Sequence, residues 1–242
     1  MKKSTKAWLL TALALVLVGA IAFAGVMSAL RWDFTKLATT AYERNLHTVT
    51  EPFDNIAVET DTADVTFALS EDGVCRVECY ENAKGTHTVT VENGSLVIRR
   101  TDNRAWYDFI GIGFASPKIT VQLPKADYAR VNVTTSTGDI ALRDLSAGTL
   151  DVTVSTGDVT LTNVVAAKLS ITSSTGDVRF DSTDAAEIAV KTSTGDVTGN
   201  LRTAKVFVTK TSTGDVRVPN TASGGKCTIT TSTGDIRITV DG

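Results

Sequence analysis

Ser136-Thr-Gly-Asp-Ile140 is the first of six copies of Ser-Thr-Gly-Asp followed by Ile or Val. The copies begin at Ser136, Ser155, Ser174, Ser193, Ser212 and Ser232, so four successive intervals are 19 residues long and the last is 20. A motif that returns at a fixed interval is typical of repeat architectures, in which each unit packs on its neighbours. The C-terminal half of the chain is therefore expected to be a repeat structure.

Apolar residues alternate on both sides of each copy, as in short β-strands. Val152 precedes one copy and Val159 follows it, and both belong in a core, yet they lie an odd number of residues apart. A straight strand cannot satisfy both, so the tetrapeptide between them must turn. Glycine supplies the positive φ that a tight corner requires. The predicted corner glycines are Gly138, Gly157, Gly176, Gly195, Gly214 and Gly234.

A unit of two short strands cannot bury its own apolar face, so it must stack on its neighbours. The predicted fold is all-β, a parallel β-solenoid (β-helix) of roughly 19-residue rungs about 4.8 Å apart, preceded by one N-terminal transmembrane helix. Asp61-Thr-Ala-Asp-Val65 looks like a degenerate copy, which places the solenoid domain at 53–242, with clear repeats over 136–242. Further strands are expected at 56–58, 65–67, 74–79, 88–91, 96–98 and 119–123.

The stacked repeats bring one acidic residue of each copy into a column. Its members are Asp139, Asp158, Asp177, Asp196, Asp215 and Asp235. We interpret them as corner residues whose carboxylates bond to backbone amides. The alternative is a calcium ladder between rungs, although calcium-binding solenoid repeats supply ligands more densely. We expect no metal site and no cofactor.

Residues 7–30 contain no charge and are long enough to cross a bilayer as a helix. Lys2, Lys3 and Lys6 precede them, which predicts a cytoplasmic N-terminus, a transmembrane signal anchor over residues 1–30 and an extracytoplasmic domain. The alternative is a signal peptide cleaved near Ala22 or Ala24, which would release a secreted domain.

Two segments fall outside the repeat pattern. Residues 31–52 show no sustained period and are interpreted as a juxtamembrane linker with one short helix. The insert at 105–117 gathers several of the few aromatic residues of this chain. Two interpretations stay open for it: a loop whose aromatic rings contact a partner, or a flap that packs on the strands. The candidate contact residues are Trp106, Tyr107, Phe109 and Phe114.

Composition argues against several function classes. From residue 31 onward, 21 basic residues face 27 acidic ones, a net charge of -6 that repels nucleic acid. The two histidines, His47 and His87, have no partner in the sequence pattern that would make them a catalytic base, and no phosphate loop or zinc-ligand spacing occurs. Cys75 and Cys79 share one face of a strand and are expected to be small buried hydrophobic residues. The alternative is a disulfide from one of them to Cys227. We therefore expect no catalytic residues and no enzyme activity.

Several motifs carry a resemblance to a known family. They are Phe53-x-x-Ile56-x-Val58, Asp64-Val65, Asn93-Gly-Ser-Leu-x-Ile98 and the Ser-Thr-Gly-Asp-Val repeats. Over roughly residues 50–242 the chain resembles the bacterial "putative adhesin" domain-of-unknown-function family, which includes cell-envelope-stress proteins. The resemblance implies a membrane-anchored β-solenoid outside the cytoplasm, and it transfers no catalytic residue.

These observations favour a non-enzymatic adhesion or interaction module at the cell envelope, whose partner is an envelope protein or a cell-surface glycan. The first alternative is an envelope-stress or regulatory accessory protein that acts on a membrane partner. The second is a carbohydrate-active enzyme that uses carboxylates on a solenoid face.

Overall fold

The structure of the protein, a computed structural model, describes residues 3–37, 42–82, 85–102 and 116–241. The described residues form two compact units, one of residues 3–37 and one of residues 42–82, 85–102 and 116–241.

The first unit contains the predicted apolar helix, α1 (Lys3–Ala29), followed by the short 3₁₀ helix η1 (Phe34–Leu37). Within α1, the 25 residues Thr5–Ala29 have a mean hydropathy of 2.6 over the most apolar window and are long enough to cross a membrane. A helix with these properties is compatible with a signal anchor and with a signal peptide.

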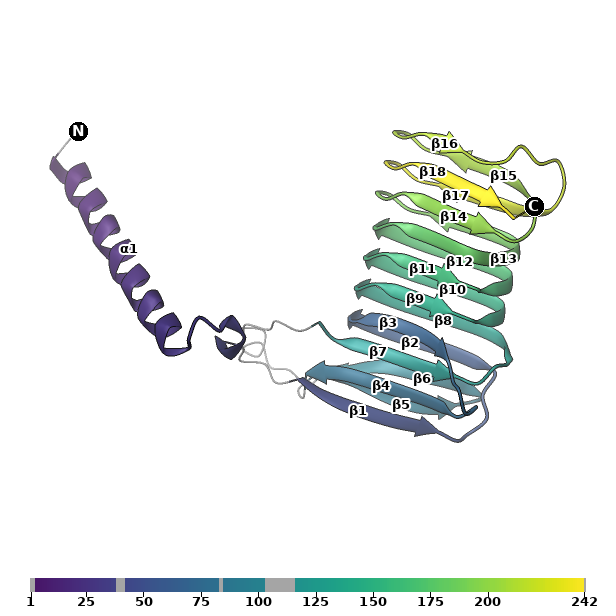
Figure 1. The fold of residues 1–242 in the computed structure, drawn as a ribbon, viewed down its shortest axis with the longest axis horizontal. Helices are drawn as coiled ribbons and strands as arrows, with labels where there is room; N and C mark the ends of the chain where they lie inside the picture. Colours follow the sequence, from purple (N-terminus) through teal and green to yellow (C-terminus); the bar gives the residue numbers. More distant parts are fainter. Residues whose placement is uncertain (1–2, 38–41, 83–84, 103–115, 242) are drawn as a thin grey trace. The chain divides into compact units, whose positions relative to one another are not determined.

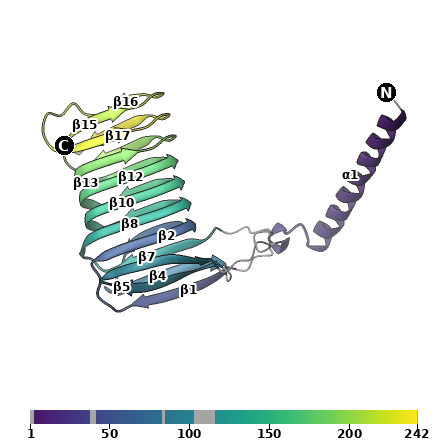
Figure 2. The ribbon, with the colours of Figure 1, turned by 180° about the vertical axis from the view of Figure 1, so that it is seen from behind.

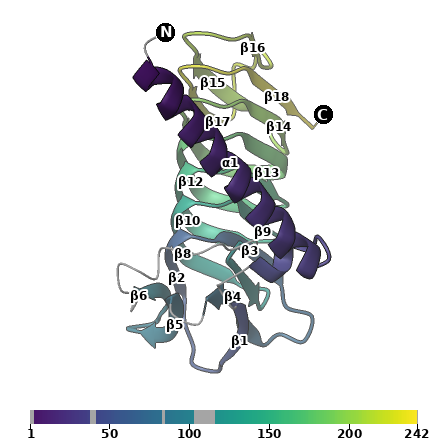
Figure 3. The ribbon, with the colours of Figure 1, turned by 90° about the vertical axis from the view of Figure 1, so that its left-hand side faces the viewer.

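The second unit is built from strands, which confirms the all-β prediction. Its strands form two sheets that lie on opposite sides of the stack (Figure 3). The first sheet contains, in spatial order, β1 (Tyr42–Val49), β4 (Cys75–Asn82), β7 (Lys118–Leu123), β3 (Asp64–Leu69), β9 (Ile140–Arg143), β11 (Val159–Thr162), the first half of β13 (Val178–Lys191), β14 (Val197–Leu201), β18 (Ile236–Val240) and β16 (Val216–Arg217). The second sheet contains β5 (Gly85–Glu92), β6 (Ser95–Asp102), β2 (Asn55–Thr62), β8 (Asp127–Thr137), β10 (Ser146–Thr156), β12 (Val165–Thr175), the second half of β13, β17 (Gly225–Thr230) and β15 (Lys205–Lys210).

Each repeat contributes one rung, which consists of a strand in the second sheet, the Ser-Thr-Gly-Asp corner and a strand in the first sheet. Adjacent rungs pair in parallel with an offset of one repeat, so that Leu150 lies beside Leu169 and Val159 beside Val178. Figures 1 and 2 show this stack from opposite sides. Because the offset equals the repeat length, equivalent residues form columns along the stack.

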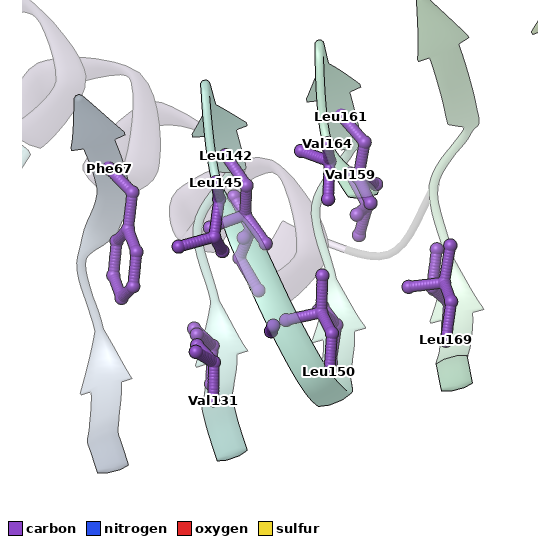
Figure 4. Packing of buried hydrophobic residues seen from close by; sticks show 14 of the residues in the cluster. Phe67, Val131, Leu142, Leu145, Leu150, Val159, Leu161, Val164 and Leu169 are labelled. Carbon is purple, nitrogen blue, oxygen red and sulfur yellow. The ribbon is translucent and has the colours of Figure 1, made fainter. Parts of the chain in front are cut away.

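The core lies between the two sheets and consists of these columns. Leu150 and Leu169 project into it from the second sheet, and Leu142 and Leu161 from the first (Figure 4). All four are fully buried, and residues alternate between buried and more exposed along each strand. Burial of one such side chain stabilises the fold by about 1.5–3 kcal/mol, which makes the columns the main source of stability.

The Ser-Thr-Gly-Asp corners have the predicted backbone conformation. The φ angles of the six corner glycines lie between 132° and 147°. A second constraint was not foreseen, because a Cβ added at Gly176 would lie 2.0 Å from the carbonyl oxygen of Gly157 in the adjacent rung. Glycine is therefore required by backbone-to-backbone contact between rungs as well as by its φ angle.

The N-terminal end of the stack departs from the predicted parallel arrangement. Strand β4 pairs antiparallel with both β1 and β7, and β5 pairs antiparallel with β6. The predicted strands of this region are all present, and the degenerate repeat forms a rung, since Val65 lies beside Ile140. The outermost strands of the two sheets at this end are therefore antiparallel to their neighbours, β1 beside β4 and β5 beside β6.

The predicted linker over residues 31–52 was wrong at its C-terminal end, because β1 occupies Tyr42–Val49. Two of its inward positions are the polar Asn45, which donates to Glu81, and His47, while Val49 packs on the core. The alternating apolar pattern that marks the other strands is therefore missing from this sequence.

The last two repeats do not stack in the order of the sequence. Strand β17 lies between β13 and β15, and β18 lies between β14 and β16. The final repeat thus occupies the second-to-last rung, and β15 and β16 form the end of the stack (Figure 1). The expectation that each repeat packs on its sequence neighbours is wrong here.

A second corner, absent from the sequence predictions, returns the chain from the first sheet to the second. Asp144, Asn163 and Ser182 have φ angles of 53°, 56° and 48° and are spaced by 19 residues. Asp and Asn adopt this left-handed conformation more readily than most residues. Leu145, Val164 and Thr183 follow them and are buried.

We predict that Gly176→Val strongly destabilises the fold, by at least about 3 kcal/mol, because a β-branched side chain meets both the positive φ and the carbonyl of Gly157. The measurement is the urea midpoint of unfolding, with Thr175→Val at the exposed neighbouring position as the control. Equal midpoints for the two variants would contradict the corner geometry.

Candidate functional site

The aspartates of the repeats form a continuous hydrogen-bonded column. The backbone N–H of Asp158 donates to Oδ1 of Asp139 at 2.9 Å, and that of Asp177 donates to Oδ1 of Asp158 at 2.8 Å. The same bond joins Asp196 to Asp177, Asp235 to Asp196 and Asp215 to Asp235. The degenerate repeat takes part, since the N–H of Asp139 donates to Oδ1 of Asp64 at 3.1 Å.

This column gives each carboxylate a structural task. Stacked at strand spacing, the negative charges repel one another, but each Oδ1 as far as Asp235 accepts a hydrogen bond from the next rung, and bonds to charged acceptors are stronger than neutral ones. Arg237 and Arg217 pair with Asp235 and Asp215 near the end of the stack. A calcium ion between rungs would have to compete with the backbone amides for these oxygens.

A buried polar cluster joins four strands at the N-terminal cap. Glu81 on β4 accepts from the backbone N–H of His87 on β5 at 2.7 Å, and its Oε2 lies 2.6 Å from His87 Nδ1. Thr60 on β2 lies 2.9 Å from His87 Nε2, and Asn45 on β1 donates to Glu81 Oε1 at 2.9 Å. Glu81 and His87 are 1% and 6% exposed, so the cluster is shielded from solvent. It fastens the cap strands to the first rung.

The same cluster contains donor types that bind transition metals. Ligand atoms of Cys79, Glu81 and His87 all lie within 4.8 Å of one another, so the structure brings His87 together with partners that the sequence did not reveal. Burial, helped by Glu81 and Glu78, raises the pKa of the Cys79 thiol to about 12, so this thiol is protonated while no metal is bound. The glutamate and histidine also hydrogen bond to each other and to neighbouring strands, which favours a structural role.

Cys75, Cys79 and Cys227 are buried free thiols, which confirms the interpretation of Cys75 and Cys79 as small core residues. Burial raises the pKa of Cys75 to about 11 and that of Cys227 to about 12. The predicted contact residues Trp106, Tyr107, Phe109 and Phe114 lie outside the described residues.

A surface hollow of about 640 Å³ opens beside the second corners, where sequence reasoning had predicted nothing. Lys125, Asp127 and Asn163 supply polar groups to it, and Leu69 and Val165 supply exposed apolar surface, 41% and 40% exposed. Clefts of this size with a few polar groups are typical ligand sites.

We predict that Asp177→Ala lowers the free energy of unfolding by about 1 kcal/mol, because it removes the acceptor for the Asp196 N–H. Asp177→Asn is the matched control, since its amide oxygen still accepts and one like charge leaves the column. The measurement is chemical denaturation with and without added calcium or chelator. A calcium-dependent midpoint that is lost in Asp177→Asn would contradict the structural role.

We predict that Glu81→Gln destabilises the fold by about 2 kcal/mol, because an amide cannot accept from both Asn45 and His87 in the buried cluster. Glu71→Gln, in an exposed turn, should leave the urea midpoint unchanged. A zinc-dependent rise in melting temperature that disappears in Cys79→Ala would show instead that the cluster binds metal.

Comparison with solved structures gives neighbours of low similarity. A "putative adhesin" from Bacteroides fragilis NCTC 9343 is 18% identical with a TM-score of 0.47, covering 84% of this chain and 99% of its own. A "putative cell adhesion protein" from Clostridium sporogenes ATCC 15579 is 10% identical with a TM-score of 0.49, covering 83% and 100%. A "putative lipid binding protein" from Parabacteroides distasonis ATCC 8503 is 13% identical with a TM-score of 0.38, covering 84% and 98%.

None of the curated proteins matches this chain. A family model does match, over residues 53–242, which is nearly the whole of the strand-built unit. The matched residues include the repeats and the antiparallel strands β4 to β6, whereas β1 precedes them. The chain belongs to the Toastrack DUF4097 family.

Proposed function

We propose that this protein is a membrane-anchored, extracytoplasmic β-solenoid that serves as a non-enzymatic adhesion or interaction module at the cell envelope. The observation that carries the proposal is that the buried polar cluster is shielded from solvent, whereas the polar groups suited to binding lie on the exposed surface. Glu81 and His87, a pair suited to acid–base chemistry, are buried and hydrogen bonded to each other. A substrate would have no access to them.

The exposed surface offers features suited to binding. The rungs repeat outward-facing polar side chains at regular spacing along the second sheet, such as Thr153, Thr172 and Lys191 in register. The hollow beside the second corners combines the exposed Lys125 and Asp127 with apolar surface. A rigid ladder with a shallow, mixed hollow fits a polymer, a glycan or another protein of the envelope.

The apolar helix supports the proposed location. Thr5–Ala29 is long and apolar enough to cross a membrane, and the lysines before it favour a cytoplasmic N-terminus. Retention of the helix would tether the strand-built unit to the outer face of the membrane. Detection of the intact N-terminus in the membrane fraction tests this against signal cleavage.

We predict that the ectodomain recovers a cell-wall polymer, glycan, matrix or envelope protein in pull-downs, and that Lys125→Glu weakens this binding about tenfold. Lys168→Glu is the matched control, because it reverses the same charge at an exposed position on β12, outside the hollow. Failure to recover any envelope component would refute the interaction role, and equal weakening by both variants would refute the hollow as its site.

The two other functions predict different results. Crosslinking on intact cells that captures one specific membrane protein through residues 31–52 or 105–117 would favour a regulatory accessory protein. A deletion strain with an unchanged envelope-stress response would count against that role. Turnover of a polysaccharide that is lost when surface carboxylates are replaced would favour a carbohydrate-active enzyme.

A further inference from the structure

The swapped order of the last two repeats leaves one rung at the end of the stack. Among the strands that the structure describes, β15 pairs only with β17, and β16 pairs only with β18. Figure 1 shows both strands beyond the rest of the stack. Each sheet therefore presents an open edge here, formed by a strand in parallel pairing, whereas the outermost strands at the opposite end, β1 and β5, are antiparallel to their neighbours.

The two open edges differ in how well they are protected. Strand β16 has only two residues, Val216 and Arg217, and Pro219 follows shortly after, which has no N–H to donate. Short strands and proline are the usual means by which proteins block an edge. Strand β15 is six residues long and contains no proline. The second sheet is thus the edge that can accept another strand.

The outward face of β15 is apolar where neighbouring strands are polar. Val206 and Val208 are 38% and 52% exposed. The residues beside them on β17 are Lys226 and Thr228. In the rung beyond, Glu187 occupies the place of Val206. Exposed β-branched residues on an unpaired edge favour association with another strand.

The free backbone groups of β15 follow from its pairing with β17. The carbonyl of Lys210 accepts from the N–H of Thr231, on the β17 side. Because alternate residues of a strand direct their N–H and C=O groups to opposite sides, Phe207 and Thr209 direct theirs to the open edge. At the start of the strand, Thr221 donates to the carbonyl of Lys205. The central part of the edge is therefore available for pairing.

We propose that β15 is the docking edge for a second copy of this chain, joined by antiparallel pairing of the two β15 strands centred on Phe207. In this register, Phe207 of each copy exchanges both backbone hydrogen bonds with the other. Val206 lies opposite Val208 of the second copy on the outer face, and Phe207 lies opposite its equivalent on the inner face. The sequence of β15 is thus complementary to itself.

Charge and parity select this register over its neighbours. It places Lys205 opposite Thr209 and Lys210 opposite Ala204, so no lysine faces another. A shift by two residues one way places Val206 opposite Lys210, and a shift the other way places Val208 opposite Ala204. A shift by one residue would set inward residues against outward ones. Pairing with a second copy therefore buries both exposed valines in one arrangement with two-fold symmetry.

This arrangement deepens the proposed function and rests on it for its biological meaning. The chain enters the strand-built unit at β1, an edge strand at the end of the stack away from β15. Two copies joined through β15 have their entry points at opposite ends of the paired stack. Copies tethered at those points would face each other from two membranes, which makes the contact a homophilic adhesion between cells.

Disulfide trapping in the full-length chain tests the register. Val206→Cys in one copy faces Val208→Cys in a second, differently tagged copy, at a non-hydrogen-bonded pair where Cα atoms lie about 4.5 Å apart, close enough for a disulfide. The native cysteines are buried. We expect crosslinked dimer from the mixture, at least about tenfold more than from either variant alone. No crosslinking would overturn the pairing, and equal crosslinking in all samples would overturn the register.

Charge substitution tests the contact without engineered cysteines. Val208→Lys in the full-length chain should abolish the dimer seen by sedimentation in detergent and the clustering of two colours of proteoliposome. Thr172→Lys, an exposed position within the stack on β12, is the matched control and should retain both. A monomeric wild-type chain, or a dimer insensitive to Val208→Lys, would overturn the proposal. The proposal would also be overturned if the wild type is monomeric and captures a different protein, and if Val208→Lys no longer captures that protein.

Different results would refute the contact between two β15 strands and the proposed interaction function. If Val208→Lys still recovers an envelope polymer in the pull-downs while the wild type is monomeric, self-association is refuted and the interaction module stands. If the wild type dimerises but does not cluster vesicles, contact between facing membranes is refuted.

Discussion

The close approach of backbones at the Ser-Thr-Gly-Asp corners is the constraint on which the structure depends. At each corner a Cβ on the glycine would lie 2.0–2.2 Å from a backbone carbonyl oxygen of the adjacent rung, so no Cβ fits between them. The corner also fixes the register, because the N–H of Gly157 donates to the carbonyl of Thr175 and that of Asp177 to the carboxylate of Asp158. Once the corners are in register, equivalent residues of adjacent rungs are aligned, and the Leu, Ile and Val side chains form the columns of the core.

Stacking identical units aligns like charges as efficiently as it aligns apolar residues. The aspartate column tolerates this because each carboxylate as far as Asp235 gains a bond from the neighbouring backbone, while Asp235 and the terminal Asp215 also pair with arginines. The N-terminal cap solves a different problem, since its strands are not copies of one another. Their register is held by the cluster of Asn45, Glu81 and His87, which has no equivalent along the repeats. A satisfied buried polar network of this kind specifies one arrangement of strands.

Sequence reasoning succeeded where information is local and periodic. Parity between Val152 and Val159 located the corner, and the glycines there have the conformation that parity required. The second corner at Asp144, Asn163 and Ser182 carries the same 19-residue period and could have been found, but its residue types vary.

The other differences could not have been found in that way. Glu81 and His87 are six residues apart, but Asn45 and Thr60 reach them from strands more distant in sequence, so no local pattern marks the cluster. Strand β1 lacks apolar alternation because Asn45 and His47 occupy two of its inward positions. The exchanged order of the last two rungs could not be predicted from the sequence, because the repeats at Ser212 and Ser232 carry the same motif. Either repeat can pair with the rung that contains β13 and β14.

That exchange has a consequence for how the chain reaches its final state. Strands β15 and β16 leave the ribosome or the translocation channel before β17 and β18, yet their place in the stack exists only after the later strands have paired with β13 and β14. The earlier pair of strands must stay unpaired until then, or pair first with β13 and β14 and be displaced by the later strands. Strands β17 and β18 thus pair first, and β15 and β16 then add to them. The stack stays incomplete until the whole repeat region has emerged. A chain cut short after residue 224 would be left with β13 and β14 exposed to whichever strand arrived next.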